Sequence, residues 1–150
     1  MIVGLVLAFL FLCCCGGYGT LWWYEDSYVP QQREDLLRYF GAPEGFGLDS
    51  KSVGDDAIAA SYVLRCQPAS ACPPDPLGKL ADWATRVGAP GVTSTSLANI
   101  FQNGGSDRRT GLRWDDFEID LTLSGSVASD GSQAVFGATI VIKGGCWSCG

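Results

Sequence analysis

The sequence predicts an α+β protein: an N-terminal membrane helix followed by a small domain with an antiparallel sheet, including a C-terminal β-hairpin, covered by one main helix. Residues 1–24 are uncharged and largely apolar, residues 75–90 carry helix start and stop signals, and residues 117–142 hold two alternating apolar segments around a turn. We divide the chain into a transmembrane or signal-anchor segment at 1–24, a juxtamembrane helix and loop at 25–56, and a small extracytoplasmic domain at 57–150.

The N-terminal segment is long enough to span a membrane. About 20 mostly apolar residues in a helix cover a hydrocarbon core of roughly 30 Å, and residues 2–23 reach that length. Trp22, Trp23 and Tyr24 fall where an interfacial aromatic belt would lie, and no A-x-A-like cleavage site precedes them. We therefore expect an uncleaved anchor. A cleaved signal peptide is the alternative, because glycines dilute the second half of the segment.

The triple cysteine at 13–15 offers a different anchor. Cys15, with Leu12 three positions before it, is the best of the three fits to a bacterial lipidation signal. The simpler interpretation is that all three cysteines are small apolar side chains facing lipid. The Gly-, Ala- and Asp-rich, Lys-poor composition is typical of a GC-rich bacterial source.

The charges that flank the segment conflict with the later cysteines. No Lys or Arg precedes the segment and Arg33 and Arg38 follow it, an arrangement that the positive-inside rule assigns to a cytoplasmic domain. The later cysteines form two close pairs, which suit local disulfides in an oxidising compartment. We expect an extracytoplasmic domain on this second ground. The disulfide candidates are Cys66, Cys72, Cys146 and Cys149, with local Cys66–Cys72 and Cys146–Cys149 bonds as the expected pairing and pairing across the two sets as the alternative.

Composition excludes several functions. Histidine is absent, which removes Ser–His–Asp and Cys–His catalysis and the common catalytic zinc sites. The net charge of −6 disfavours nucleic acid, whose phosphates need clustered positive charge. We expect no cofactor, no metal and no nucleic-acid partner, and we favour a non-enzymatic protein.

The first part of the domain predicts a helix, a loop and a strand. Leu36, Leu37 and Phe40 fall at helical spacing before the stop signal Gly41, either as a surface-lying, partner-binding helix or as ordinary packing on the domain. Residues 42–56 are rich in Gly, Pro, Ser and Asp and predict a loop. The alternation that follows, around Tyr62, predicts a strand.

The main helix has clear boundaries. Asp75 is a typical N-cap, Pro76 suits the first helical position, and Gly88 with Pro90 ends the helix. Its apolar stripe would cover one face of the sheet. Trp83 lies beside the stripe, at the rim of the core or on a contact surface. A weaker helical turn follows at 96–105.

The C-terminal hairpin can be registered from its turn. Asp130 and Gly131 form a preferred two-residue turn, and pairing outwards from it places Leu121 opposite Ile140, with both apolar sets on one face. A slip of one residue would expose that whole set, so the register is strongly specified.

Two further cross-strand pairs agree with this register. Glu118 faces Lys143, a favourable pair of opposite charges. Phe136 lies opposite Gly125, where an aromatic ring covers the backbone that glycine leaves bare.

An acidic run is the first candidate site. Asp116, Glu118 and Asp120 alternate onto one strand face, where carboxylates could perform acid–base chemistry or hold a hard cation. We favour a solvated sheet face, because the spacing matches no known metal loop and Glu118 pairs with Lys143.

The cysteines are the second candidate site. Cys146 and Cys149 form a C-x-x-C motif, but the chain leaves no helix after it to lower the thiol pKa, so we favour a structural disulfide over an oxidoreductase. A four-thiolate zinc site with Cys66 and Cys72 would require a cytoplasmic domain.

Together these observations predict a membrane-anchored extracytoplasmic domain that binds a protein or envelope component, with residues 1–24 in the membrane. The alternatives are an envelope thiol–disulfide enzyme and a cytoplasm-facing zinc-binding domain. The binding-surface candidates are Trp83, Asp116, Glu118, Asp120 and Trp147.

Overall fold

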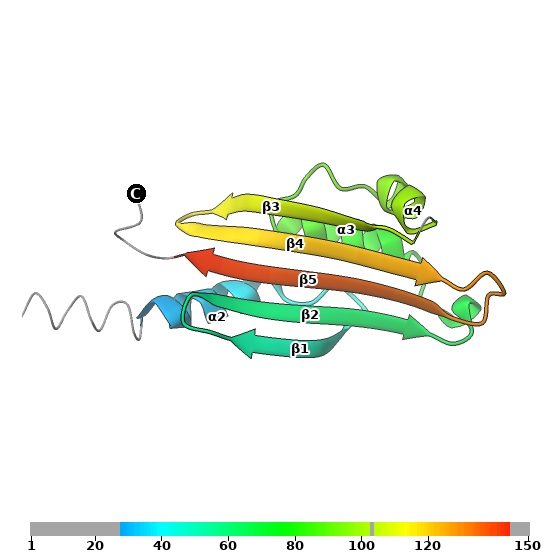
Figure 1. Cartoon of the computed structure of the whole chain (residues 1–150), viewed down its shortest axis with the longest axis horizontal. Coiled ribbons are helices and arrows are strands. Elements are labelled where there is room, and N and C mark those ends of the chain that lie inside the picture. The colour runs from blue at the N-terminus through cyan, green and yellow to red at the C-terminus, as the bar shows by residue number, and fades with distance from the viewer. Residues whose placement is uncertain (1–27, 103, 145–150) are drawn as a thin grey trace, which may run out of the picture.

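A computed structural model describes residues 28–102 and 104–144 of the chain. Three helices lie against one face of a five-stranded sheet (Figure 1). The strands are β1 (Gly47–Val53), β2 (Ala57–Cys66), β3 (Ser106–Trp114), β4 (Phe117–Val127) and β5 (Ala134–Gly144). The helices are α2 (Val29–Phe40), α3 (Pro76–Arg86) and α4 (Ser94–Gln102), with a short 3-10 turn, η2, at Ala69–Ala71. The sheet order is β1-β2-β5-β4-β3 with antiparallel neighbours, so the predicted α+β class is confirmed.

The core lies between the sheet and the helices. Burial alternates along β4 and β5, as expected when successive side chains point to opposite faces. Ile119, Leu121 and Ile140 are fully buried against helix residues such as Leu80 and Leu97. Three helices share the cover, where the sequence predicted one main helix.

The predicted hairpin register is confirmed. Leu121 pairs with Ile140 and Gly125 with Phe136. The loop is wider than a two-residue turn, because the strands end at Val127 and Ala134 and the N–H of Gly131 donates to the carbonyl of Ala128 inside the loop.

The ring that fills the space above Gly125 is not the one predicted. A Cβ at Gly125 would lie 2.3 Å from Cδ2 of Phe101, which comes from α4. Phe136 lies beside that ring, with 6.4 Å between the ring centroids. The sequence register could identify the cross-strand neighbour but not the helix that packs above it.

The prediction of a loop at 42–56 is wrong where β1 forms. β1 pairs with β2 along the edge of the sheet, with an irregularity between Leu48 and Ser50. All seven of its residues are exposed, so its sequence lacks the alternation that marks a half-buried strand.

α2 packs on the domain, so the interpretation of this helix as ordinary packing is confirmed. Val29, Leu37 and Phe40 are buried, and Arg33 is only 6% exposed. Residues 28–56 therefore share a core with the domain that we expected to begin at residue 57.

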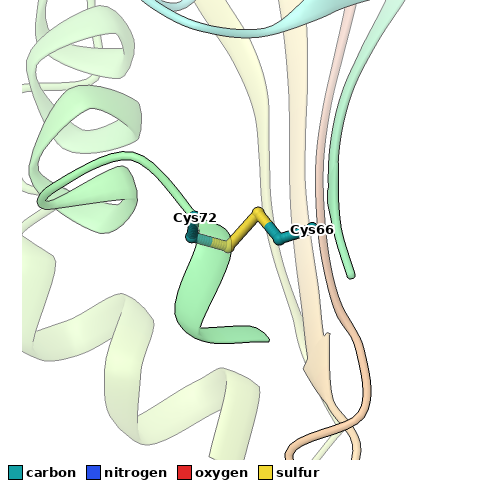
Figure 2. The surroundings of a disulfide bond; sticks show 2 residues. All are labelled: Cys66 and Cys72. Atoms are coloured by element: carbon teal, nitrogen blue, oxygen red, sulfur yellow. A yellow bond between two sulfur atoms is a disulfide. The ribbon is translucent and has the colours of Figure 1, made fainter. Parts of the chain in front are cut away.

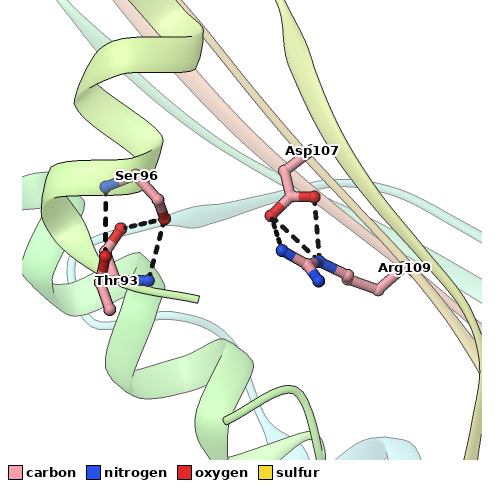
Figure 3. Close-up of polar contacts among 4 residues, drawn as sticks. All are labelled: Thr93, Ser96, Asp107 and Arg109. Carbon is pink, nitrogen blue, oxygen red and sulfur yellow. Dashed lines mark hydrogen bonds and ion pairs between the residues drawn. The ribbon is translucent and has the colours of Figure 1, made fainter. Parts of the chain in front are cut away.

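The two later helices begin with side-chain caps. The carboxylate of Asp75 accepts from the backbone N–H of Gly78 at 2.9 Å, so the predicted N-cap is confirmed. At the start of α4, Thr93 and Ser96 exchange hydrogen bonds between side chain and backbone N–H (Figure 3).

No helix within residues 28–102 and 104–144 is long and apolar enough to cross a membrane. The segment at 1–24, for which the sequence predicts a membrane helix, lies outside the described residues.

Candidate interaction surface

The sheet has a second face, which the described helices leave uncovered and which points toward the viewer in Figure 1. We call it the helix-free face. The side chains that its three central strands place there include Ala59, Ser61, Val63, Thr122, Ser124, Thr139 and Val141. All are small or β-branched, so the centre of this face is shallow.

Two hydroxyls at its centre bond to each other. The hydroxyls of Ser61 and Thr139, which face each other across β2 and β5, are 2.9 Å apart. Gly137 has no side chain, and the hydroxyl of Ser124 takes that space, since a Cβ at Gly137 would lie 2.8 Å from it. A partner that covers this region therefore meets one pair of hydroxyls that is already hydrogen-bonded.

A charged pair lies at one end of the helix-free face. The ammonium of Lys143 lies 2.5 Å from a carboxylate oxygen of Asp120, whose other oxygen accepts from the backbone N–H of Gly111 at 3.1 Å. The hydrogen bond from Lys143, with help from Gly111, lowers the pKa of Asp120, and the same bond raises the pKa of Lys143. Both groups are therefore charged at neutral pH.

The ion pair differs from the predicted one. Glu118 lies opposite Lys143 in register, as expected, but Lys143 bonds to Asp120, its diagonal neighbour. A long lysine reaches a diagonal neighbour easily on a twisted sheet, and Asp120 gains a second donor from β3.

The acidic run does not form a single row of carboxylates. Asp116 lies in the turn before β4 and is exposed, so the prediction that it shares a strand face with Glu118 and Asp120 is wrong. The lowered pKa of Asp120 is the opposite of what a general acid requires. Within the part of the chain that the structure describes, no three Cys, Asp or Glu side chains stand together as a metal site.

A partly buried ion pair on β3 was not among the predicted sites. Asp107 is 9% exposed, and both of its oxygens accept from the guanidinium of Arg109 at 3.0 to 3.2 Å (Figure 3). The two residues alternate along one strand, which is the only sequence signal for the pair. Since the carboxylate is fully paired, this contact stabilises the edge strand rather than forming a reactive site.

Trp83 is not a surface residue. Its side chain is fully buried, and its indole N–H donates to the carbonyls of Phe40 and Gly41 at 3.2 and 2.9 Å. The prediction that Trp83 contributes to a binding surface is therefore wrong, because the ring fills the junction between α2 and α3.

The predicted disulfide between Cys66 and Cys72 is confirmed (Figure 2). It joins the end of β2 to the segment after η2, with the two Cα atoms 5.1 Å apart. The bond occupies both sulfurs, so they are not available as zinc ligands while it persists. Cys15, Cys146, Trp147 and Cys149 lie outside the described residues.

The chain matches no protein-family model, no curated protein and no solved structure. The helix-free face must therefore be interpreted from its own chemistry.

The aromatic rings of the described strands lie on the helix side of the sheet. Tyr62, Phe117 and Phe136 are buried there, and Trp114 contacts Phe40 of α2. Sites for small molecules are concave and usually lined by aromatic and apolar groups, whereas the helix-free face offers a broad surface of small side chains. This arrangement suits the surface of another protein.

Proposed function

We propose that this chain is a membrane-anchored, extracytoplasmic and non-enzymatic module that binds a protein partner in the cell envelope. The observation that carries the proposal is the helix-free face. The hydroxyls of Ser61 and Thr139 bond to each other and Asp120 bonds to Lys143, so these groups are already paired, and the face offers a broad surface of small side chains rather than reactive groups.

Two features support a membrane-anchored domain on the extracytoplasmic side. Residues 1–24 have the length and composition of an anchor, and a disulfide such as Cys66–Cys72 is typical of an oxidising compartment. α2 begins shortly after the anchor segment, and Arg33 fixes it to the end of the sheet that holds Gly144. Cys66 lies at the other end of β2, so the anchor would hold the disulfide end away from the bilayer.

Thiol labelling of intact cells tests whether the domain lies on the extracytoplasmic side of the membrane. We expect Cys66 and Cys72 to react with a membrane-impermeant maleimide only after a membrane-impermeant reductant has acted from outside. A version with Ser at the other five cysteines isolates this pair. Labelling that requires cell lysis and no reductant would place the domain in the cytoplasm and overturn this part of the proposal.

Site-directed photo-crosslinking tests the binding face. We expect a photoreactive residue in place of Thr139, at the centre of the helix-free face, to give a discrete crosslinked product in intact cells. The control position is Thr95, which is exposed on α4 on the other side of the sheet. Equal yields at both positions, or no product at Thr139, would contradict binding through this face.

A thiol–disulfide enzyme is the second candidate, favoured by the C-x-x-C spacing of Cys146 and Cys149. Replacing both by Ser separates the two functions. An exchange enzyme would lose turnover of a disulfide substrate with its fold unchanged, whereas the binding module would keep its crosslinks at Thr139.

A further inference from the structure

We infer that the partner of the helix-free face is a second copy of this chain, so that two sheets pack face to face in a symmetric dimer. The inference rests on the proposed binding role of this face and names its partner.

The size of the face fits a stable dimer. β2, β4 and β5 are 10 or 11 residues long. Strands about 4.8 Å apart that rise about 3.3 Å per residue give a five-stranded face of roughly 24 by 33 Å, or about 800 Å². Each partner in a typical stable interface buries about 800 Å². The helix-free face alone therefore supplies the required area.

The side chains at its centre suit sheet-on-sheet packing. Two sheets pack face to face when their side chains interdigitate, at a spacing of about 10 Å. Ala59, Val63 and Val141 supply short apolar groups for this contact. The Ser61–Thr139 hydrogen bond pairs two of the central hydroxyls within each copy, which lowers the cost of removing water from these two groups.

The charges on the face permit self-association. In a symmetric dimer the same patch meets itself, so a patch with a net charge would repel its copy. The protein has a net charge of −6, but the helix-free face is close to balanced. Its charged residues are Glu118 and Asp120, together with Asp49, which pairs with Arg65 at 3.1 Å, against Arg65, Arg108, Arg113 and Lys143, so three acidic groups meet four basic ones. Much of the acidic excess lies in turns, for example at 55–56 and 115–116. A nearly neutral face also gives little attraction to nucleic acid or anionic lipid.

The edges of the sheet are less suited to pairing than its face. Both edge strands carry register irregularities, in β1 between Leu48 and Ser50 and in β3 between Arg109 and Leu112. Lys51 on β1 and the arginines of β3 add charge to the two edges. Bulges and charged side chains are the usual protection against edge-to-edge association, so the face remains the better contact.

Sedimentation of the full chain in detergent, over a range of concentrations, tests the inference. We expect a dimer that dissociates on dilution. Val141→Lys would bury an added charge in the interface and should weaken association by about 100-fold. Thr95→Lys adds the same charge on the helix side, and we expect it to leave the dimer unchanged.

The outcomes separate the alternatives. A wild-type chain that stays monomeric at its highest soluble concentration overturns the inference, as does a dimer that survives Val141→Lys, since its contact would then lie elsewhere, for instance in the anchor. Thermal unfolding shows whether Val141→Lys is folded; if it is not, Ala59→Lys on the neighbouring strand replaces it. The thiol-labelling result does not depend on association, so loss of the dimer would leave the proposed location standing.

Discussion

Gly125 shows how a single residue fixes the position of a helix. Its backbone lies under the ring of Phe101, and the space that a Cβ would need is occupied by that ring. Phe101 is itself buried and lies beside Phe136, so the ring has little room to move. α4 can therefore approach the sheet closely only because residue 125 has no side chain.

We expect Gly125→Ala to lower the free energy of unfolding by about 1–3 kcal/mol, because overpacking forces the ring or the backbone to shift. The intrinsic preference of a strand for Ala over Gly opposes this loss, but it amounts to only about 0.5–1 kcal/mol. Urea unfolding measures the difference. Gly91→Ala is the matched control, since a Cβ there meets nothing within 4 Å. Equal stability of the two variants would contradict the packing argument.

The Asp120–Lys143 pair predicts a dependence of stability on pH. The pKa of Asp120 is lowered in the folded protein, so its contribution is present above the ordinary aspartate pKa of about 3.9 and is lost as pH falls through the folded value. The pKa of Lys143 is raised, so its contribution is present below the ordinary lysine pKa of about 10.4 and is lost as pH rises through the folded value.

We therefore expect wild type to unfold at a higher temperature than Asp120→Asn near neutral pH, with the difference shrinking at both extremes. Thermal unfolding followed by circular dichroism across pH measures it. Glu118→Gln is the control, because Glu118 is exposed and its attraction for Lys143 is weaker than that of Asp120. A difference that stays constant with pH would show that the ion pair is not its cause.

For single residues, the sequence predicted the place of a side chain in the sheet better than the side chain that it contacts. The hairpin register placed Glu118, Lys143 and Gly125 correctly, since alternation and turn chemistry are local. It could not predict that Lys143 would choose Asp120, or that Phe101 would cover Gly125, because those choices depend on twist and on a helix distant in sequence. Trp83 failed as a surface residue for the same reason: its neighbour across the core, α2, is about 40 residues away.

Among the strands, a pattern of alternating burial decides whether the strand can be predicted from the sequence. β4 and β5 alternate between buried and open positions and could be aligned residue by residue. β1 has no buried side chain, so pairing with β2 rather than its own pattern makes it a strand. The capping residues of α3 predicted its position. The close approach of α4 to the sheet depends on Gly125, and the sequence could not show that Phe101 packs over this glycine.

The disulfide links two elements that share no hydrogen-bonded ladder. Cys66 ends β2 with its side chain in the core, and Cys72 leads into the loop before α3 (Figure 2). Replacing both by Ala should lower the free energy of unfolding by about 2–3 kcal/mol, the chain-entropy value for so short a loop.

Urea unfolding in a background that lacks Cys146 and Cys149 measures this effect without interference from the second pair. Reduction of the parent protein should lower stability by a similar amount. If the alanine variant proved as stable as the oxidised parent, the bridge would not constrain the fold.

For the whole molecule, Arg33 joins the first described helix to the end of the last described strand. Its Nε donates to the carbonyl of Gly144 at 2.9 Å and its Nη1 to the carbonyl of Asp55 at 2.7 Å. One buried guanidinium thus connects α2, the end of β5 and the β1–β2 turn. Positive-inside counting treated this residue as a flanking charge, but its contacts make it part of the fold.

We expect Arg33→Met to lower the free energy of unfolding by about 2–4 kcal/mol, because two carbonyls lose a charged donor in a buried position. Hydrogen exchange should show lost protection in α2 and at the end of β5, while protection at the centre of β4 falls only with global stability. Arg38→Met is the control on the same helix. The Arg38 side chain is 77% exposed and pairs with an exposed Asp35, so its loss should cost less than about 0.5 kcal/mol. If both variants lost the same stability, the two hydrogen bonds of Arg33 would contribute no more than an exposed ion pair, and burial of Val29, Leu37 and Phe40 alone would hold α2 on the sheet.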